Sequence, residues 1–274
     1  MAEPDPEAIH IPVSADDSND SAFGDDISDT TSVASTIWRH RYENGRRYHK
    51  FREDFADEFP DCEVIGTDLS PIQPQFCPPN CHFEIDDCTE PWTFPKNSFD
   101  MIHVRCLFGS VGDWPAFYRE ALDHLRPGGW INQMEMAIQF KADDGTCPPD
   151  HTMAEWSKLF IETADKFGKT MKVADDMKTW ITEAGFEDVN EVRFKLPVGP
   201  WSSDPKMKEL GKWNLLYCYH GCEGWAMFLL THVLKWKYEE VMVLVAKFKE
   251  ALRDRKTHAY YDVSVVYGRK PSAS

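Results

Sequence analysis

The sequence predicts an α/β fold, in which strands and helices alternate around a mainly parallel sheet. Short apolar runs of strand length are followed by longer segments with the apolar spacing of amphipathic helices. Asp68 stands directly after one such run, residues 64–67, and open parallel sheets bind ligands beyond their strand ends. A chain of 274 residues with 42% hydrophobic residues can also bury a sizeable core. One large α/β domain is therefore expected.

Residues 1–36 are expected to form a disordered acidic tail, which leaves residues 37–274 as the folded domain. The segment contains no Lys or Arg, is rich in Ser and Thr, and shows almost no periodic apolar pattern. It buries too little surface to offset the entropy lost on ordering. We expect a solvated tail that folding does not need; partner binding is the alternative. Its acidic residues are Glu3, Asp5, Glu7, Asp16, Asp17, Asp20, Asp25, Asp26 and Asp29.

The elements of the expected domain follow in order. Residues 37–59 look helical apart from an interruption at Asn44-Gly45, and Pro60 ends this segment. A later helix is closed by the turn at residues 126–129, which contains Pro and two Gly residues. The expected strands are residues 63–67, 82–85, 99–105, 130–136, 186–196 and 259–267, and the further helices are residues 114–125, 152–167, 173–184, 205–232 and 237–253.

Composition excludes several classes of partner. The net charge of −16 and the pI near 5.0 argue against direct binding to nucleic acid or to anionic membranes, which needs a basic surface. No apolar run approaches the roughly 18 residues of a membrane span, and the N-terminus lacks the pattern of a signal peptide. An intracellular protein of the cytoplasm or nucleus is expected, and its eight cysteines are then mostly reduced thiols.

Two cysteine pairs have four-residue spacing, Cys77 with Cys81 and Cys218 with Cys222. A zinc site needs four ligands at matched spacing. The sequence favours ordinary small apolar residues at these positions, and no metal is assigned.

Acidic residues at two strand ends are the candidate ligand-binding residues. Asp68 is placed for a ribose diol, and its alternative role is to cap the turn that begins at Leu69. Asp86 and Asp87 end the next strand, where a carboxylate can accept a hydrogen bond from an adenine amino group. The backbone N–H of Cys88 would then donate to a ring nitrogen. For Asp87, a structural role is the alternative to an adenine contact.

The other half of a nucleotide site is missing from the sequence. A ribose-binding acid is normally preceded, about 20 residues upstream, by a strand, a glycine-rich turn and the start of a helix. Gly45 provides the one glycine context nearby, and it follows no apolar strand.

The order of these motifs resembles the class I S-adenosylmethionine-dependent methyltransferases, and more narrowly the LaeA-like methyltransferases of fungal secondary metabolism. The resemblance covers about residues 37–271 and implies a Rossmann-like sheet with S-adenosylmethionine as cofactor. It implies ribose binding by Asp68, adenine contact by Asp87, and Arg105 and Cys106 beside the methionine moiety. The segments that carry it are RYENGRRYHKFRE, VIGTDLSP, FEIDD with WTFP, SFDMIHVR, HLRPGGWINQME and HAYYDVSVVYGRKP.

The chain departs from that family between Glu53 and Asp54. There the family has several tens of further residues, which include the first, central strand of the sheet and a loop of the type D-x-G-x-G-x-G. Without that loop the cofactor carboxylate loses its backbone N–H donors. A mispredicted splice junction and a diverged gene explain the departure equally well.

The sequence leaves the chemistry of the acceptor open. Six aromatic residues between positions 201 and 228 suggest a pocket for a small aromatic metabolite, although most of them are expected in the core. No catalytic residue is assigned, and His103, His220 and Glu135 are weak candidates for a general base. Two functions remain: a methyltransferase, or a non-catalytic relative that assists a pathway or its regulation by binding a metabolite or a pathway protein. The six aromatic residues are Trp201, Trp213, Tyr217, Tyr219, Trp225 and Phe228.

Overall fold

The computed structural model describes residues 11–13, 40–43, 46–49, 59–70 and 77–272. These residues fall into two compact units, one formed by residues 1–20 with 93–274 and the other by residues 21–92.

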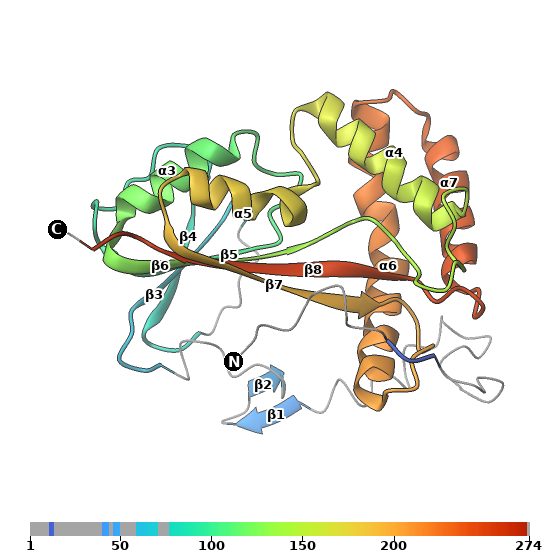
Figure 1. Cartoon of the computed structure of the whole chain (residues 1–274), viewed down its shortest axis with the longest axis horizontal. Helices are drawn as coiled ribbons and strands as arrows, with labels where there is room; N and C mark the ends of the chain where they lie inside the picture. Colours follow the sequence, from blue (N-terminus) through green and yellow to red (C-terminus); the bar gives the residue numbers. More distant parts are fainter. Residues whose placement is uncertain (1–10, 14–39, 44–45, 50–58, 71–76, 273–274) are drawn as a thin grey trace. The chain divides into compact units, whose positions relative to one another are not determined.

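The larger unit is built on a four-stranded sheet (Figure 1). Its order is β5-β6-β8-β7, with β5 parallel to β6 and with β8 antiparallel to both β6 and β7. The two central strands, β6 and β8, alternate buried and less buried residues, as strands covered on one face do. The strands are β5 (Phe99–Arg105), β6 (Leu125–Met136), β7 (Glu187–Pro197) and β8 (Tyr260–Arg269).

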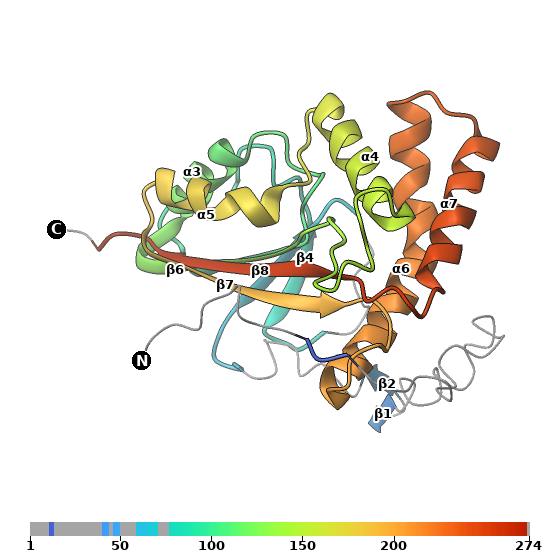
Figure 2. The ribbon, with the colours of Figure 1, turned by 45° about the vertical axis from the view of Figure 1, so that its right-hand side comes forward.

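Helices cover one face and one end of this sheet. Both views show α3 and α5 side by side on one face (Figure 2). The other three helices pack together at the end of the sheet where β6 and β7 end, and stacked Trp156 and Phe248 lie between α4 and α7 with their ring centroids 4.1 Å apart. The helices are α3 (Trp114–His124), α4 (Thr152–Phe167), α5 (Val173–Glu183), α6 (Pro205–His232) and α7 (Tyr238–Leu252).

Local sequence signals set the helix ends. Asp113 and Asp204 accept backbone N–H bonds at the starts of α3 and α6, and a proline occupies the first turn of each. Gly168 ends α4 in the left-handed conformation, with φ 77°. These signals explain why the expected boundaries of the helices and strands after residue 150 agree with the structure to within about two residues.

The described residues of the smaller unit form two pairs of strands. β3 (Val64–Asp68) and β4 (Cys81–Ile85) are parallel and in register from Val64–Cys81 to Asp68–Ile85. β1 (His40–Glu43) and β2 (Arg46–His49) form an antiparallel pair. The helical expectation for residues 37–59 is therefore wrong where the structure describes them. Asn-Gly between two strands is a strong hairpin signal, and the helical apolar spacing outweighed it in the prediction.

A second correction concerns β6, which begins at Leu125 rather than at Trp130. The expected turn at residues 126–129 pairs with the end of the chain, since Gly128 N–H donates to the Lys270 carbonyl and Lys270 N–H donates to the Gly129 carbonyl. Long-range pairing thus extends the strand through two glycines.

β3 and β5 each pair on one side. Among the described strands, β3 pairs with β4 alone and β5 with β6 alone. The expected consequence of a missing central strand was that these two strands would lack a common neighbour. Within the described ranges they belong to separate sheets.

Residues 11–13 correct the expectation of a wholly disordered tail. Val13 forms a bridge with Ser202, and Ser203 N–H donates to the Pro12 carbonyl at 2.8 Å. Ile11 is 4% exposed and packs against Trp201 and Tyr260. The rest of residues 1–36 lies outside the described part of the chain. No helix in the described ranges is both long and apolar enough to cross a membrane.

Candidate functional site

The predicted acidic residues lie at one edge of the β3–β4 pair. Because these strands are parallel and in register, Asp68 ends β3 beside Ile85, the last residue of β4. Asp86 N–H then donates to the Asp68 carbonyl at 3.1 Å. The structure therefore brings together Asp68, Asp86, Asp87 and Cys88 at the carboxyl edge of this pair.

The carboxylates at this edge also shape their own turns. Asp68 Oδ1 accepts from Ser70 N–H at 2.9 Å, which is the capping role considered as its alternative. Asp86 Oδ1 accepts from Asp87 N–H at 2.9 Å. Asp87 Oδ1 accepts both from Thr89 N–H at 2.9 Å and from the Thr89 hydroxyl at 2.7 Å. A carboxylate has two oxygens and about four acceptor positions, so these local bonds do not exclude ligand binding.

Arg105, the fifth predicted residue, lies in the larger unit at the end of β5. The next residue, Cys106, adopts a left-handed conformation with φ 54°, which is uncommon for a residue with a side chain. Its N–H donates to the Met134 carbonyl at 3.0 Å. The chain therefore turns sharply where it leaves β5.

Glu135, on β6, stabilises this turn through hydrogen bonds. Its side chain is fully buried. Oε1 accepts from Leu107 N–H at 3.0 Å and Oε2 accepts from Phe108 N–H at 3.2 Å. Gln133 Nε2 also donates to Oε1 at 3.0 Å, and the Tyr118 hydroxyl donates to Gln133 Oε1 at 2.7 Å. A single carboxylate thus fixes two consecutive backbone amides after the strained residue.

Burial dominates the electrostatics of this region. It raises the pKa of Glu135, while the hydrogen bonds from Gln133, Leu107 and Phe108 oppose that shift. Burial also raises the pKa of the Cys106 thiol; the Glu135 carboxylate adds to this effect, and Arg105 opposes it. The thiol is therefore not activated as a nucleophile.

The three candidate bases have different surroundings. His103 is exposed on β5, with Nδ1 2.9 Å from Asn132 Oδ1. His220 lies on α6 in edge contact with Tyr219, at a centroid distance of 5.7 Å. Glu135 has the structural contacts described above. None of the three acquires a contact that would single it out as a base.

The six predicted aromatic residues differ in how exposed their side chains are. Trp201 is 5% exposed and donates to the Ala259 carbonyl, so it belongs to the core. Trp213 Nε1–H donates a hydrogen bond to Glu209 Oε1. The cationic groups of Lys249 and Arg253 lie over the ring of Tyr219. The exposed group is Tyr217, Trp225 and Phe228, with Tyr217 and Trp225 rings 5.0 Å apart.

The cysteine pairs lie in different units. Cys77 Sγ donates to the Cys81 carbonyl in the smaller unit, while Cys218 and Cys222 are buried on α6 in the larger one. All eight cysteines lie in the described part of the chain and are in the thiol form.

The sequence did not reveal that Glu135 stabilises the turn after β5, and Glu135 was considered only as a candidate base. The available signal was its position: Ile131, Gln133 and Glu135 alternate along β6 on the buried face. A polar residue at such a position must find buried partners.

Comparisons with known proteins agree with the motifs. The model of a methyltransferase domain family matches residues 45–191. The methyltransferase pytC of Aspergillus terreus is 33% identical over 302 positions, covering 90% of this chain and 93% of pytC. The secondary metabolism regulator LAE1 of Cochliobolus heterostrophus is 34% identical, covering 80% of this chain and 72% of LAE1. The protein-methionine methyltransferase laeA of Emericella nidulans is 30% identical over 80% of this chain and 59% of its own length.

The alignment with pytC is longer than this chain. It spans 302 positions, whereas this chain has 274 residues. The relative therefore contains residues that have no counterpart here.

Proposed function

The chain belongs to the methyltransferase domain family, among the LaeA-like methyltransferases of fungal secondary metabolism. From this premise we propose that it acts on or binds a small aromatic metabolite, with S-adenosylmethionine as the cofactor if its site is functional. The observation that carries the cofactor proposal is the shared edge of β3 and β4, where Asp68 and Asp86–Asp87 end two adjacent parallel strands. Ligands of open α/β sheets bind beyond such edges.

The residues at this edge fit the adenosine half of the cofactor. Asp68 would accept from the ribose hydroxyls, Asp87 from the adenine amino group, and Asp86 and Cys88 belong to the same turn. When bound, S-adenosylmethionine supplies an activated methyl group, and transfer then depends mainly on the alignment of the acceptor. Arg105, at the end of β5, remains our proposed contact for the methionine end.

The methionine half has no matching donor set in the described chain. A carboxylate at that end needs backbone N–H groups from a glycine-rich turn between a strand and a helix. The described residues directly before β3, 59–63, form a turn that is closed by the bond from Cys62 N–H to the Phe59 carbonyl. We therefore derive no catalytic step through the cofactor.

The aromatic nature of the acceptor is supported by the exposed side chains of α6. Tyr217 and Trp225 are 47% and 36% exposed, and the nearby Cys106 thiol contributes, after burial, to the raised pKa of Tyr217. Flat aromatic molecules stack on such rings.

A non-catalytic role is the second candidate, and a specific observation favours it. β3 and β5 pair with no common strand among those described, so the described residues supply no central strand that pairs with both. Under this alternative the protein binds a metabolite or a pathway protein and assists biosynthesis or its regulation without methyl transfer.

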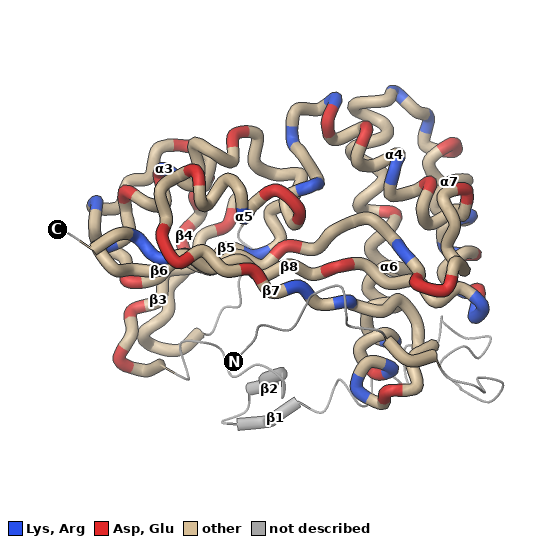
Figure 3. Tube along the Cα trace, viewed as in Figure 1, with Lys and Arg blue, Asp and Glu red and all other residues tan. Residues whose placement is uncertain are grey.

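We propose that neither nucleic acid nor a membrane is a direct partner of this protein. The chain carries a net charge of −16, and Lys and Arg residues lie among Asp and Glu residues along α4, α7 and the sheet (Figure 3). Such a surface gives little of the electrostatic attraction that phosphate backbones require. We propose a location in the cytoplasm or nucleus, which the reduced state of the eight cysteines supports.

Titration calorimetry with S-adenosylhomocysteine tests the cofactor proposal. Losing two charge-assisted bonds costs about 3–6 kcal/mol, or roughly a hundred- to ten-thousandfold in affinity. We expect no saturable binding by the unmodified chain below about 1 mM. A variant with a family-like strand and glycine loop inserted after Glu53 should bind at micromolar concentrations.

Asp68→Asn in the inserted variant should weaken binding about tenfold or more, while Asp61→Asn, an exposed carboxylate in the same unit, should not. Micromolar binding by the unmodified chain would support the methyltransferase function without the inserted loop. An inserted variant that binds no cofactor, or in which Asp68→Asn changes nothing, would contradict the proposed adenosine site.

A further inference from the structure

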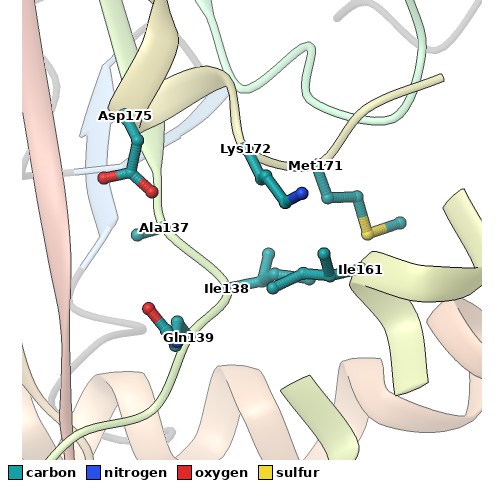
Figure 4. A pocket seen from close by; sticks show the side chains of 7 residues that line it. All are labelled: Ala137, Ile138, Gln139, Ile161, Met171, Lys172 and Asp175. Atoms are coloured by element: carbon teal, nitrogen blue, oxygen red, sulfur yellow. The ribbon is translucent and has the colours of Figure 1, made fainter. Parts of the chain in front are cut away.

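A cavity of about 140 Å³ lies in the larger unit, directly beyond the end of β6 (Figure 4). Three consecutive residues after β6 form its floor, and α4, α5 and the loop between them form its walls. Neither the sequence motifs nor the family comparisons assign a role to this cavity. Its lining residues are Ala137, Ile138, Gln139, Ile161, Met171, Lys172 and Asp175.

The size and walls of the cavity suit one ring. Ile138, Ile161 and Met171 supply apolar surface. A cavity of about 150 Å³ in another protein binds benzene, so 140 Å³ accommodates a single six-membered ring. Met171 also makes favourable contacts with aromatic rings through its polarisable sulfur.

The polar groups of the cavity carry opposite charges. The Lys172 ammonium and the Asp175 carboxylate both border it, together with the Gln139 amide (Figure 4). Lys172 Nζ lies 3.2 Å from Asp165 and Asp175 Oδ1 lies 2.9 Å from Arg193. Lys172 and Asp175 side chains are 47% and 50% exposed, so solvent weakens these pairs and a ligand can join them. A ligand that carries both charges matches this arrangement.

The position of the cavity relates it to the proposed function. Met171 packs beside Gly109, where an added Cβ would lie 3.3 Å from Met171 Cε, and Gly109 N–H donates to the Thr170 carbonyl at 2.9 Å. Gly109 belongs to the loop after β5, in which Glu135 accepts from the Leu107 and Phe108 amides. The cavity thus adjoins the segment for which we propose contact with the methionine end of the cofactor.

We propose that this cavity binds a single-ring aromatic α-amino acid, as the acceptor or as the recognised part of a larger acceptor; the assignment as acceptor rests on the proposed function. The ring lies among Ile138, Ile161 and Met171. The α-carboxylate pairs with Lys172 and the α-ammonium with Asp175. Recognition through two opposite charges distinguishes this ligand from a neutral aromatic metabolite.

Calorimetry of the full chain with three probes tests the proposal. L-Phenylalanine carries both charges, 3-phenylpropanoate lacks the ammonium group, and 2-phenylethylamine lacks the carboxylate. We expect L-phenylalanine to bind most tightly. Lys172→Gln should weaken L-phenylalanine and 3-phenylpropanoate about fivefold and leave 2-phenylethylamine unchanged, because an exposed ion pair contributes up to about 1 kcal/mol. Asp175→Asn should weaken L-phenylalanine and 2-phenylethylamine and leave 3-phenylpropanoate unchanged.

Two matched variants control for net charge and for helix stability. Lys178→Gln and Asp176→Asn make the same charge changes on α5 but alter residues that do not line the cavity. Both should leave all three affinities unchanged. Thermal unfolding of all four variants verifies that each is folded at the titration temperature.

The proposal is overturned if L-phenylalanine shows no saturable binding up to about 10 mM, or if the control variants change the affinities as much as the cavity variants do. Loss of affinity for all three probes in one variant would also contradict it. Lys172 and Asp175 would then not recognise the carboxylate and the ammonium group of the ligand independently. These titrations contain no cofactor, so they separate the cavity from methyl transfer. Binding without methylated product would leave the cavity assignment standing and count against the enzyme.

Discussion

At the scale of single residues, Glu135 shows how a buried charge shapes the candidate site. Transfer of a carboxylate out of water is unfavourable unless hydrogen-bond donors surround it. Leu107, Phe108 and Gln133 provide three such donors at 3.0–3.2 Å. Their arrangement keeps Cys106 in its left-handed conformation at the end of β5.

Glu135→Gln should lower the free energy of unfolding by roughly 1–3 kcal/mol, because the new amide group cannot accept from all three donors and leaves a buried N–H unpaired. Urea denaturation measures this change. Glu187→Gln, at a side chain that is 54% exposed, is the matched control and should change stability by less than about 0.5 kcal/mol. Equal effects of the two substitutions would refute the positioning role.

The Asp144–His258 pair gives a pH-dependent contribution at the same scale. Burial alone would raise the pKa of Asp144, but hydrogen bonds from His258 and Thr146 outweigh it and hold the pKa below the ordinary value of 3.8. A lowered carboxyl pKa stabilises the fold above that ordinary value, and the contribution is lost as pH falls through the folded-state pKa.

The unfolding free energy of the wild type should exceed that of Asp144→Asn by at most about 1 kcal/mol at pH 6, since Asp144 is 37% exposed. The difference should shrink as the pH falls below 3.8. Denaturation curves from pH 3 to pH 6 measure it, and a difference that grows toward acid pH would contradict the sign.

At the scale of an element, α6 depends on a close backbone contact. An added Cβ at Gly211 would lie 2.0 Å from the Gly199 carbonyl oxygen, and Gly199 N–H donates to the Gly211 carbonyl at 3.0 Å. The helix can approach the segment after β7 because position 211 has no side chain. This approach brings Asn214 to Tyr261, whose hydroxyl donates to Asn214 Oδ1 at 2.6 Å.

Gly211→Ala should destabilise the protein by roughly 2–3 kcal/mol, because backbone must move to relieve the overlap. Gly224 lies on the same helix, and an added Cβ there meets nothing within 4 Å. Gly224→Ala should therefore be neutral or stabilising by up to about 1 kcal/mol. Thermal unfolding compares the two, and a Gly211→Ala variant as stable as Gly224→Ala would show that the contact is not required.

At the scale of the whole chain, the N-terminal residues contribute to a core that lies far away in sequence. Ile11 packs against Trp201 and Tyr260, and Pro12 and Val13 pair with Ser203 and Ser202. Burying one Ile side chain contributes about 1.5–3 kcal/mol. The expectation that residues 1–36 are dispensable therefore needs correction at residues 11–13.

Removal of residues 1–10 should leave the midpoint of thermal unfolding within a degree or two. Removal of residues 1–13 should lower the free energy of unfolding by roughly 2 kcal/mol and the midpoint by roughly 5 °C. The shorter deletion is the control for the longer one. Identical midpoints for both shortened chains would mean that the docking of Ile11 contributes nothing.

The sequence by itself determined the features that depend on local pattern. The strands and helices after residue 150, the carboxylate at the end of β3 and the helix caps at Asp113 and Asp204 all follow from the spacing of apolar residues and from short capping signals. Family membership follows from motif order. These features are local because periodicity and hydrogen bonding within a few residues fix them.

The tertiary structure alone decided which distant residues meet. It paired residues 11–13 with residues 202–203, extended β6 through its glycines, and placed Glu135 under the amides of Leu107 and Phe108. It also formed the cavity from the residues after β6, from α4 and α5, and from the loop between these helices. Such contacts depend on how whole elements pack. A buried polar group or an apolar surface interacts with the residues that the fold brings near to it, and the local spacing of residues in the sequence does not specify which residues these are.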